Sequence, residues 1–182
     1  MFDSSSSIEA SQYDKQFQFA KRMVSNFNIG ETGVRFGGLV FSRFTKVLFN
    51  LKDHETVESL NKALSNVEFM ASSTYTHEAF ETVDNQQLFG SAKGGRSDAP
   101  DVLVVFTDGD PTFVDKAIEA SKKLKDKGVL IIGVGIGKGL KMSVLQQISS
   151  TPDDALEASS YETLDYIEKR LTKLLCDLSK SG

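Results

Sequence analysis

Two nearly unbroken apolar runs constrain the fold more strongly than any other feature of the sequence. They are Val102–Phe106 and Val129–Val134, and each is followed by a pattern typical of a helix, from about Phe113 to Lys127 and from Met142 to Ile148. Apolar runs of this length suit strands that are buried on both faces of a sheet. Strands that alternate with helices predict an α/β domain with a mostly parallel sheet.

The rest of the chain continues this alternation. Apolar residues at helical spacing predict a helix from Tyr13 to Phe27 and a last helix from Leu164 to Leu178. Runs at Val34–Phe41 and Lys46–Leu51 predict a hairpin that adds one antiparallel edge strand. The remaining expected elements are short: Thr56–Leu64, Thr76–Phe89 and Ala155–Ser159. We therefore expect a Rossmann-like, doubly wound sheet with helices on both faces, in a single domain over residues 1–182.

Composition excludes several classes of function. Of the 182 residues, 25 % are charged and the net charge is −4, so nothing predicts electrostatic binding to nucleic acid or to anionic lipid. No stretch approaches the roughly 18 apolar residues of a membrane span. The chain contains one cysteine, Cys176, which cannot form an internal disulfide, and its two histidines do not form a zinc pattern.

Polar side chains rich in oxygen gather where loops are expected. Asp3, Ser5 and Ser7 alternate in an Asp-Ser-Ser-Ser-Ser run, Thr74 lies in a loop before a helix, and Asp108 directly follows a buried strand. In such sheets ligands bind at the carboxyl ends of the strands. Carboxylate and hydroxyl oxygens are hard ligands that suit Mg²⁺ and are compatible with Mn²⁺. Ca²⁺ is larger than such a site prefers. The sequence therefore predicts a magnesium site on three loops.

Three other interpretations compete with this one. A serine run on its own is more often a solvated cap or linker. A phosphoryl-transfer enzyme of the haloacid-dehalogenase type would need a second aspartate where Ser5 stands. The glycines that alternate around Lys138 do not match a phosphate-binding loop, because Leu140 breaks the required spacing. Those glycines are better explained by tight turns.

Three motifs in order resemble the von Willebrand factor A domain family. They are Asp3-x-Ser5-x-Ser7, Thr74 within Ser-Thr-Tyr-Thr, and Asp108 within Thr-Asp-Gly after an apolar strand. The segments 33–42 and 129–137 also resemble the second and fifth strands of that family. The resemblance runs from about residue 3 to residue 178. It is most similar to the extracellular-matrix branch, which includes matrilins, collagen VI and mussel byssal matrix proteins.

The resemblance implies a function in adhesion rather than catalysis. In this family the five matching positions form a metal-ion-dependent adhesion site, where an acidic group of a protein partner completes the coordination of the ion. It implies a secreted matrix protein whose partner is another matrix protein, such as collagen. Tyr75, His77 and Asp110 stand next to the motifs and are candidate contacts for that partner, although His77 is also explained as a solvated or capping residue and Asp110 as part of a helix-initiating turn. A structural assembly domain with a vestigial metal site is the alternative.

The chain departs from the family pattern at its start. The first strand of the family is central in the sheet and should lie directly before Asp3, where only Met1 and Phe2 stand. We therefore expect a truncated first strand and a longer parent protein. In matrix members a cysteine before this strand often pairs with one after the last helix, so Cys176 is expected either to bond to a residue outside this chain or to be an ordinary buried cysteine.

Overall fold

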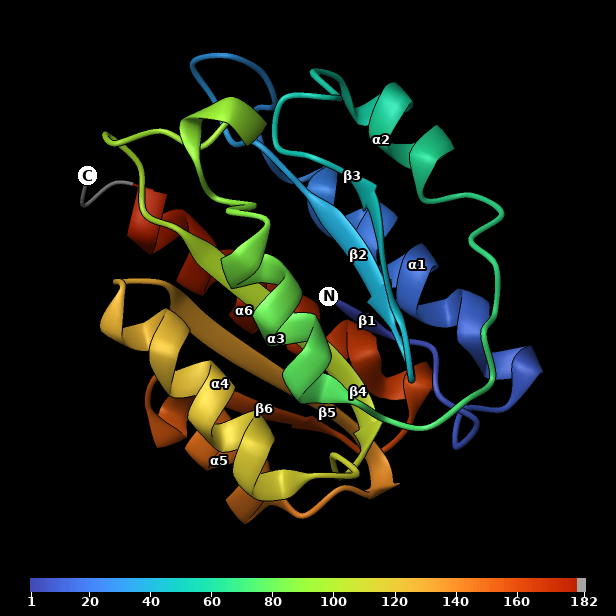
Figure 1. The fold of residues 1–182 in the computed structure, drawn as a ribbon. Helices are drawn as coiled ribbons and strands as arrows, with labels where there is room; N and C mark the ends of the chain where they lie inside the picture. Colours follow the sequence, from blue (N-terminus) through green and yellow to red (C-terminus); the bar gives the residue numbers. More distant parts are fainter. Residues whose placement is uncertain (180–182) are drawn as a thin grey trace.

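The computed structural model describes residues 1–179, and a six-stranded sheet forms its centre. The strands lie in the order β3-β2-β1-β4-β5-β6, and all neighbours are parallel except β2 and β3, which pair antiparallel. Their bounds are β1 Phe2–Asp3, β2 Gly38–Phe41, β3 Thr45–Phe49, β4 Val102–Gly109, β5 Leu130–Gly139 and β6 Ala155–Ala158. The expected doubly wound sheet with one antiparallel edge strand is confirmed (Figure 1).

Helices cover both faces of this sheet, as Figure 1 shows. The α-helices are α1 Ala10–Val24, α2 Val57–Ala63, α3 Thr76–Asn85, α4 Val114–Asp126, α5 Met142–Ile148 and α6 Leu164–Ser179. Short 3₁₀ turns lie at η1 Ser91–Lys93, η2 Pro152–Asp154 and η3 Tyr161–Thr163. Helices α1, α2 and α6 pack on one face, and α3, α4 and α5 pack on the other.

Each face has its own hydrophobic core. Phe17, Phe19 and Leu171 are buried on the side of α1 and α6, whereas Phe80 and Leu124 are buried on the side of α3 and α4. The apolar runs of β4 and β5 contribute alternate side chains to both cores, because successive residues of a strand point to opposite faces. This is why the two runs do not alternate between apolar and polar residues.

Several element boundaries differ from the sequence-based expectation. Strand β2 begins at Gly38 rather than Val34, because its pairing with β1 starts only at Val40 and a register shift lies between Gly38 and Leu39. Helix α3 ends at Asn85 rather than Phe89. Thr76 is the first residue of this helix, and the capping position belongs to Tyr75, whose side chain makes no capping hydrogen bond.

Strand β5 is longer than predicted because glycines let its end approach β4. The strand continues to Gly139, which pairs with Gly109. A Cβ atom on Gly139 would lie 2.6 Å from the carbonyl oxygen of Asp108, so a larger residue would push the two strand ends apart. The glycines were expected to form tight turns, but Gly137 lies within β5, where its φ of +80° is a conformation that favours glycine. This close approach fixes the position of Asp108 at the carboxyl edge.

Strand β1 is short, although it is central in the sheet. It has 2 residues, whereas its neighbour β4 has 8, so the first strand is short as expected. Phe2 pairs with Val40 on one side and with Phe106 on the other. Its ring also stacks on Phe106, with 5.3 Å between centroids. The strand therefore ends at the carboxyl edge of the sheet, where Asp3 begins the first polar loop.

Two further expectations concern membranes and Cys176. Among the described residues, no helix has the length and apolar character needed to cross a membrane. Cys176 lies on α6, is partly buried, and forms no disulfide within the described chain. A bond to a residue outside this chain stays a prediction.

Candidate metal centre

Asp3 is the innermost residue of the predicted site. Its carboxylate is fully buried at the end of β1, where Oδ1 accepts a hydrogen bond from the Ser5 amide at 2.8 Å and Oδ2 accepts one from the Thr107 hydroxyl at 2.6 Å. The Gln16 side chain donates to the Asp3 carbonyl oxygen at 2.9 Å. These bonds fix both the backbone and the carboxylate.

Burial raises the pKa of Asp3 to about 6. The hydrogen bonds from Ser5 and Thr107 oppose this rise, and the nearby charge of Asp108 adds to it. Burial disfavours the charged form of a carboxylate, and donors that point at it only partly compensate. The site therefore holds a buried anion that a cation would stabilise.

A chain of hydroxyl groups connects the first loop to the end of β4. The Ser5 and Ser7 Oγ atoms lie 2.9 Å apart, and the Ser7 hydroxyl donates to Asp108 Oδ1 at 2.6 Å. Burial raises the pKa of Asp108, and the hydrogen bond from Ser7 opposes the rise. Four of the five predicted ligands thus form one continuous network.

The third loop reaches the same edge through its backbone. Ser5 forms a bridge with Ser72, and the Ser6 amide donates to the Ser72 carbonyl at 2.7 Å. The Thr112 amide donates to the Thr74 carbonyl at 2.9 Å, which ties this loop to the one after β4. In residues 1–179 no hydrogen bond joins the Thr74 hydroxyl to the other predicted ligands. The Thr74 backbone therefore lies on the same rim, but its hydroxyl lies outside the network, and its role as a ligand stays a prediction.

The donor set fits a small divalent cation. Neighbouring ligands of an octahedral Mg²⁺ ion stand about 2.9 Å apart, given metal–oxygen distances of about 2.0–2.1 Å, and the Ser5 and Ser7 oxygens have this separation. The described residues contain no group of three or more His, Cys, Asp or Glu side chains that could hold a metal, so the hydroxyls are essential to the set. Two carboxylates and three hydroxyls would leave a divalent ion able to accept another anionic ligand.

The three candidate contacts beside the site have different surroundings. His77 is buried, and its ring stands 5.4 Å from Phe113 in an edge-on contact and 5.6 Å from Tyr75. The expectation of a solvated histidine is therefore wrong, because Phe113, which is distant in the sequence, lies edge-on to the His77 ring. Asp110 accepts a hydrogen bond from the Lys141 amide at 2.7 Å, which links the loops after β4 and β5. That bond gives Asp110 a structural role whether or not it contacts a partner.

Sequence reasoning missed two residues that support Asp3. Thr107 belongs to the Thr-Asp-Gly motif, yet only its neighbour Asp108 was predicted to take part in the site. Gln16 is fully buried in α1 between the apolar residues Tyr13 and Ala20. A buried amide on the apolar face of a helix needs a hydrogen-bonding partner, and this was the available signal.

Comparison with known proteins identifies the family. The family model described as von Willebrand factor type A domain matches residues 1–170. The chain belongs to the von Willebrand factor A family. Human collagen alpha-6(VI) chain is 34 % identical over 182 residues, which cover 99 % of this chain and 8 % of the collagen chain. Human matrilin-1 is 27 % identical, over 97 % of this chain and 36 % of matrilin-1.

Solved structures agree with this assignment. Proximal thread matrix protein 1 from the mussel byssus superposes with a TM-score of 0.89 at 28 % identity, over 96 % of this chain and 46 % of that one. A second structure of the same mussel protein, with a zinc-occupied MIDAS motif, superposes with a TM-score of 0.84 at 28 % identity, over 97 % of this chain and 46 % of that one. A divalent metal therefore binds that motif in a close structural neighbour.

These relatives indicate the function of this chain only at the level of the family branch. This chain spans less than half the length of each relative described here. The relatives are extracellular-matrix proteins, so the expected matrix location is confirmed at the level of the family branch.

Proposed function

We propose that this domain is a divalent-ion-dependent adhesion module of the extracellular matrix. The observation that carries the proposal is the continuous network from buried Asp3 through Ser5 and Ser7 to Asp108. In this network two carboxylates at the ends of β1 and β4 meet two hydroxyls of the loop after β1, and the Thr74 loop lies on the same rim. Homology to matrix proteins and a metal-bearing neighbour support the same function.

Each residue has a distinct role in this function. Asp3 supplies a carboxylate that Thr107 and the Ser5 amide hold in place. Ser5 and Ser7 supply neutral oxygens, so the set carries only the two charges of Asp3 and Asp108. A bound Mg²⁺ ion supplies a Lewis-acidic centre that can accept a carboxylate from a partner. We propose Mg²⁺ as the ion, with Mn²⁺ or Zn²⁺ able to replace it.

The surface around the site suits an acidic residue with apolar neighbours. Phe44, at the turn between β2 and β3, is 69 % exposed, and Phe113, at the start of α4, is 40 % exposed. Phe113 packs against Tyr75, with 5.2 Å between ring centroids. Exposed aromatic side chains next to a charged centre are typical of binding surfaces. We propose another matrix protein, such as a collagen, as the partner, with Tyr75 and Phe113 as contacts and His77 as their buried support.

Calorimetric titration with Mg²⁺ and Mn²⁺ tests this proposal. We expect binding by the unmodified chain and at least a tenfold loss of affinity in Ser7→Ala, because that change removes a ligand and the bond to Asp108. Ser6→Ala is the matched control, since Ser6 is exposed and only its backbone is bonded. If neither Mg²⁺ nor Mn²⁺ binds, or if Ser6→Ala and Ser7→Ala weaken binding equally, the proposal is wrong.

One observation favours a structural domain with a vestigial site as the second candidate. Ser7 donates directly to Asp108, so the network is satisfied by protein groups alone. In that case, capture of a matrix partner would be insensitive to EDTA. We propose no catalytic role: the relatives are matrix proteins, and turnover of a phosphate ester that requires Asp108 would contradict this view.

A further inference from the structure

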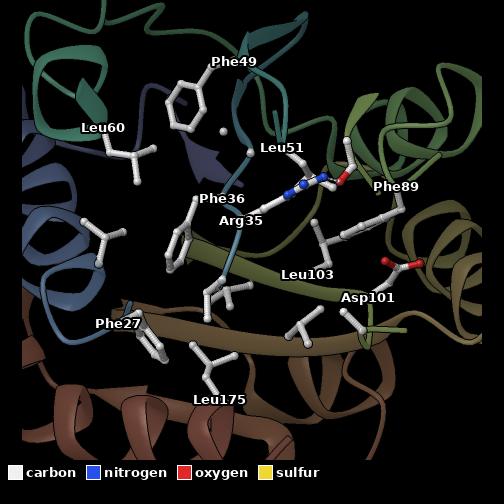
Figure 2. Close-up of a pocket in the computed structure, with 18 of the residues that line it drawn as sticks. Phe27, Arg35, Phe36, Phe49, Leu51, Leu60, Phe89, Asp101, Leu103 and Leu175 are labelled. Carbon is white, nitrogen blue, oxygen red and sulfur yellow. Dashed lines mark hydrogen bonds between the residues drawn. The ribbon is translucent and has the colours of Figure 1, made fainter. Parts of the chain in front are cut away.

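Two guanidinium groups stand at the margin of a cavity at the end of the sheet opposite to the metal site. The cavity has a volume of about 550 Å³ and lies between the segment leading into β2 and the start of β4 (Figure 2). Arg35 and Arg96 both line it. The rest of the lining is mostly apolar and includes Phe36, Leu103 and Leu175, so the charged groups at the margin need partners of their own.

One backbone oxygen accepts a hydrogen bond from both guanidinium groups. Arg35 Nη2 donates to the Glu31 carbonyl oxygen at 3.4 Å, and Arg96 Nη1 donates to the same oxygen at 2.8 Å. The two nitrogens therefore lie within about 6 Å of each other, a distance at which two positive charges repel. An anion placed between or beside the two groups would relieve this repulsion.

The charge of this pair is only partly balanced by the protein. In residues 1–179 no carboxylate forms an ion pair with Arg35, and the one ion pair of Arg96 is with Asp98, whose Oδ1 lies 3.6 Å from Nε. The Asp98 side chain is 81 % exposed, compared with 24 % for Arg96. Exposed ion pairs contribute little, because water screens them. The Glu31 side chain is exposed, so both guanidinium groups remain open to a further anion.

Two lysines extend the positive charge beside the guanidinium pair. A Cβ atom on Gly94 would lie 2.6 Å from the Lys52 nitrogen, so the loop that carries Gly94 packs directly against Lys52. This contact fixes the Gly94 carbonyl, which accepts a hydrogen bond from Arg35 at 2.8 Å. Lys93 is the preceding residue, and neither lysine forms an ion pair within the described part of the chain. The Asp53 carboxylate accepts hydrogen bonds from two neighbouring amide nitrogens.

We propose that this cluster binds an oxyanion, a sulfate or phosphate ester group, and that in the matrix the group is a sulfate of a polysaccharide. Arginine presents its donors in a fork that matches the oxygens of such anions. Among the described residues Arg35 uses two of its five donors in hydrogen bonds and Arg96 uses one, so both keep donors for a ligand. The matrix location of the relatives favours the sulfate ester. The proposal does not depend on metal binding.

Titration calorimetry with a trisulfated disaccharide tests this proposal, and EDTA in every sample separates the cluster from the metal centre. We expect the 182-residue chain to bind this disaccharide and not its unsulfated form. Arg35→Lys and Arg96→Lys should each weaken binding about tenfold, because they keep the charge but lose the fork. Arg43→Lys, at an exposed position in the turn between β2 and β3, is the matched control and should bind as tightly as the unmodified chain.

Asp98→Asn gives a prediction in the opposite direction. It should strengthen binding about twofold or more, because it removes a carboxylate that competes for Arg96. Circular dichroism of each variant provides the folding control.

Three results would overturn the proposal. They are the absence of binding in EDTA, an equal loss in Arg43→Lys and in the two cluster variants, and weaker binding in Asp98→Asn. Inorganic phosphate that binds as tightly as the disaccharide would show that the cluster takes any free oxyanion, and would overturn the assignment to a polysaccharide.

Discussion

The two ends of strand β1 bury ionisable groups in opposite ways. At its carboxyl end, the Asp3 carboxylate receives hydrogen bonds from Ser5 and Thr107 and lies near the hydroxyls of two loops. At its amino end, the Met1 nitrogen makes one hydrogen bond and otherwise faces an apolar cavity. The comparison shows that the fold provides hydrogen-bonding partners for a charge at one edge of the sheet and an apolar cavity at the other.

The largest expected effect concerns the Met1 end. The pKa of this amino group falls from 8.0 to about 5 on folding, so the unfolded chain binds more protons between these values, and stability should rise with pH across this window. A shift of three units corresponds to about 4 kcal/mol. Urea unfolding from pH 5 to pH 8 should show this slope in the unmodified chain and lose most of it after acetylation of the amino group. The same slope in both forms would show that Met1 is not its source.

The next effect concerns the Asp3 end. Asp3→Ala should weaken Mg²⁺ binding by at least 100-fold, or about 3 kcal/mol, because it removes one of two anionic ligands and leaves the Ser5 amide without its acceptor. Titration calorimetry measures the loss. Asp14→Ala, at an exposed position of α1 outside the network, is the control, and an equal loss in both variants would contradict a specific role for Asp3.

A third prediction compares packing near and far from the cavity. Leu171→Ala should destabilise the domain by about 3 kcal/mol, because Leu171 is fully buried in a packed core. Leu175→Ala, one turn further along α6, should cost about 1 kcal/mol, because its side chain lines the cavity and loses fewer contacts. Denaturant unfolding measures both values. Equal costs would show that the cavity wall is as tightly packed as the core.

The smallest expected effect is at Thr107. Thr107→Val should weaken Mg²⁺ binding by about tenfold, because the Asp3 carboxylate loses a donor and its pKa rises further. Thr107→Ser keeps the hydroxyl and should bind the ion nearly as well as the unmodified chain. Parallel titrations of the two variants separate loss of the donor from loss of volume, and similar affinities in both would contradict the prediction.

The sequence predicted those features that depend on local pattern. The apolar runs predicted β4 and β5, and the spacing of Asp3, Ser5 and Ser7 together with Asp108 predicted a cluster that the structure brings together. A strand that is buried on both faces appears in the sequence as an unbroken apolar run. The first polar residue after the run then lies at the carboxyl edge of the sheet.

Features that depend on tertiary contact were predicted less well. His77 was expected to be a partner contact or a solvated or capping residue, yet it is buried, with Phe113 edge-on to its ring. Strand β2 was predicted four residues too long, because its apolar residues continue where no partner strand exists. The role of Gln16 required knowledge that α1 crosses the Asp3 carbonyl. In each case the deciding neighbour is far away in the sequence.

In the serine run after Asp3, each residue has a role that is set by its position. Ser4 accepts a hydrogen bond from the Met70 amide at 2.8 Å, Ser5 and Ser7 join the network, and Ser6 is exposed. Deleting one serine would therefore leave a nearly identical polar segment but exchange which hydroxyls face the neighbouring loop and which face Asp108, as in a register slip of a strand. Along this run the length is under stronger constraint than the identity of the residue at the exposed position, so indels should be far more damaging there than substitution of Ser6.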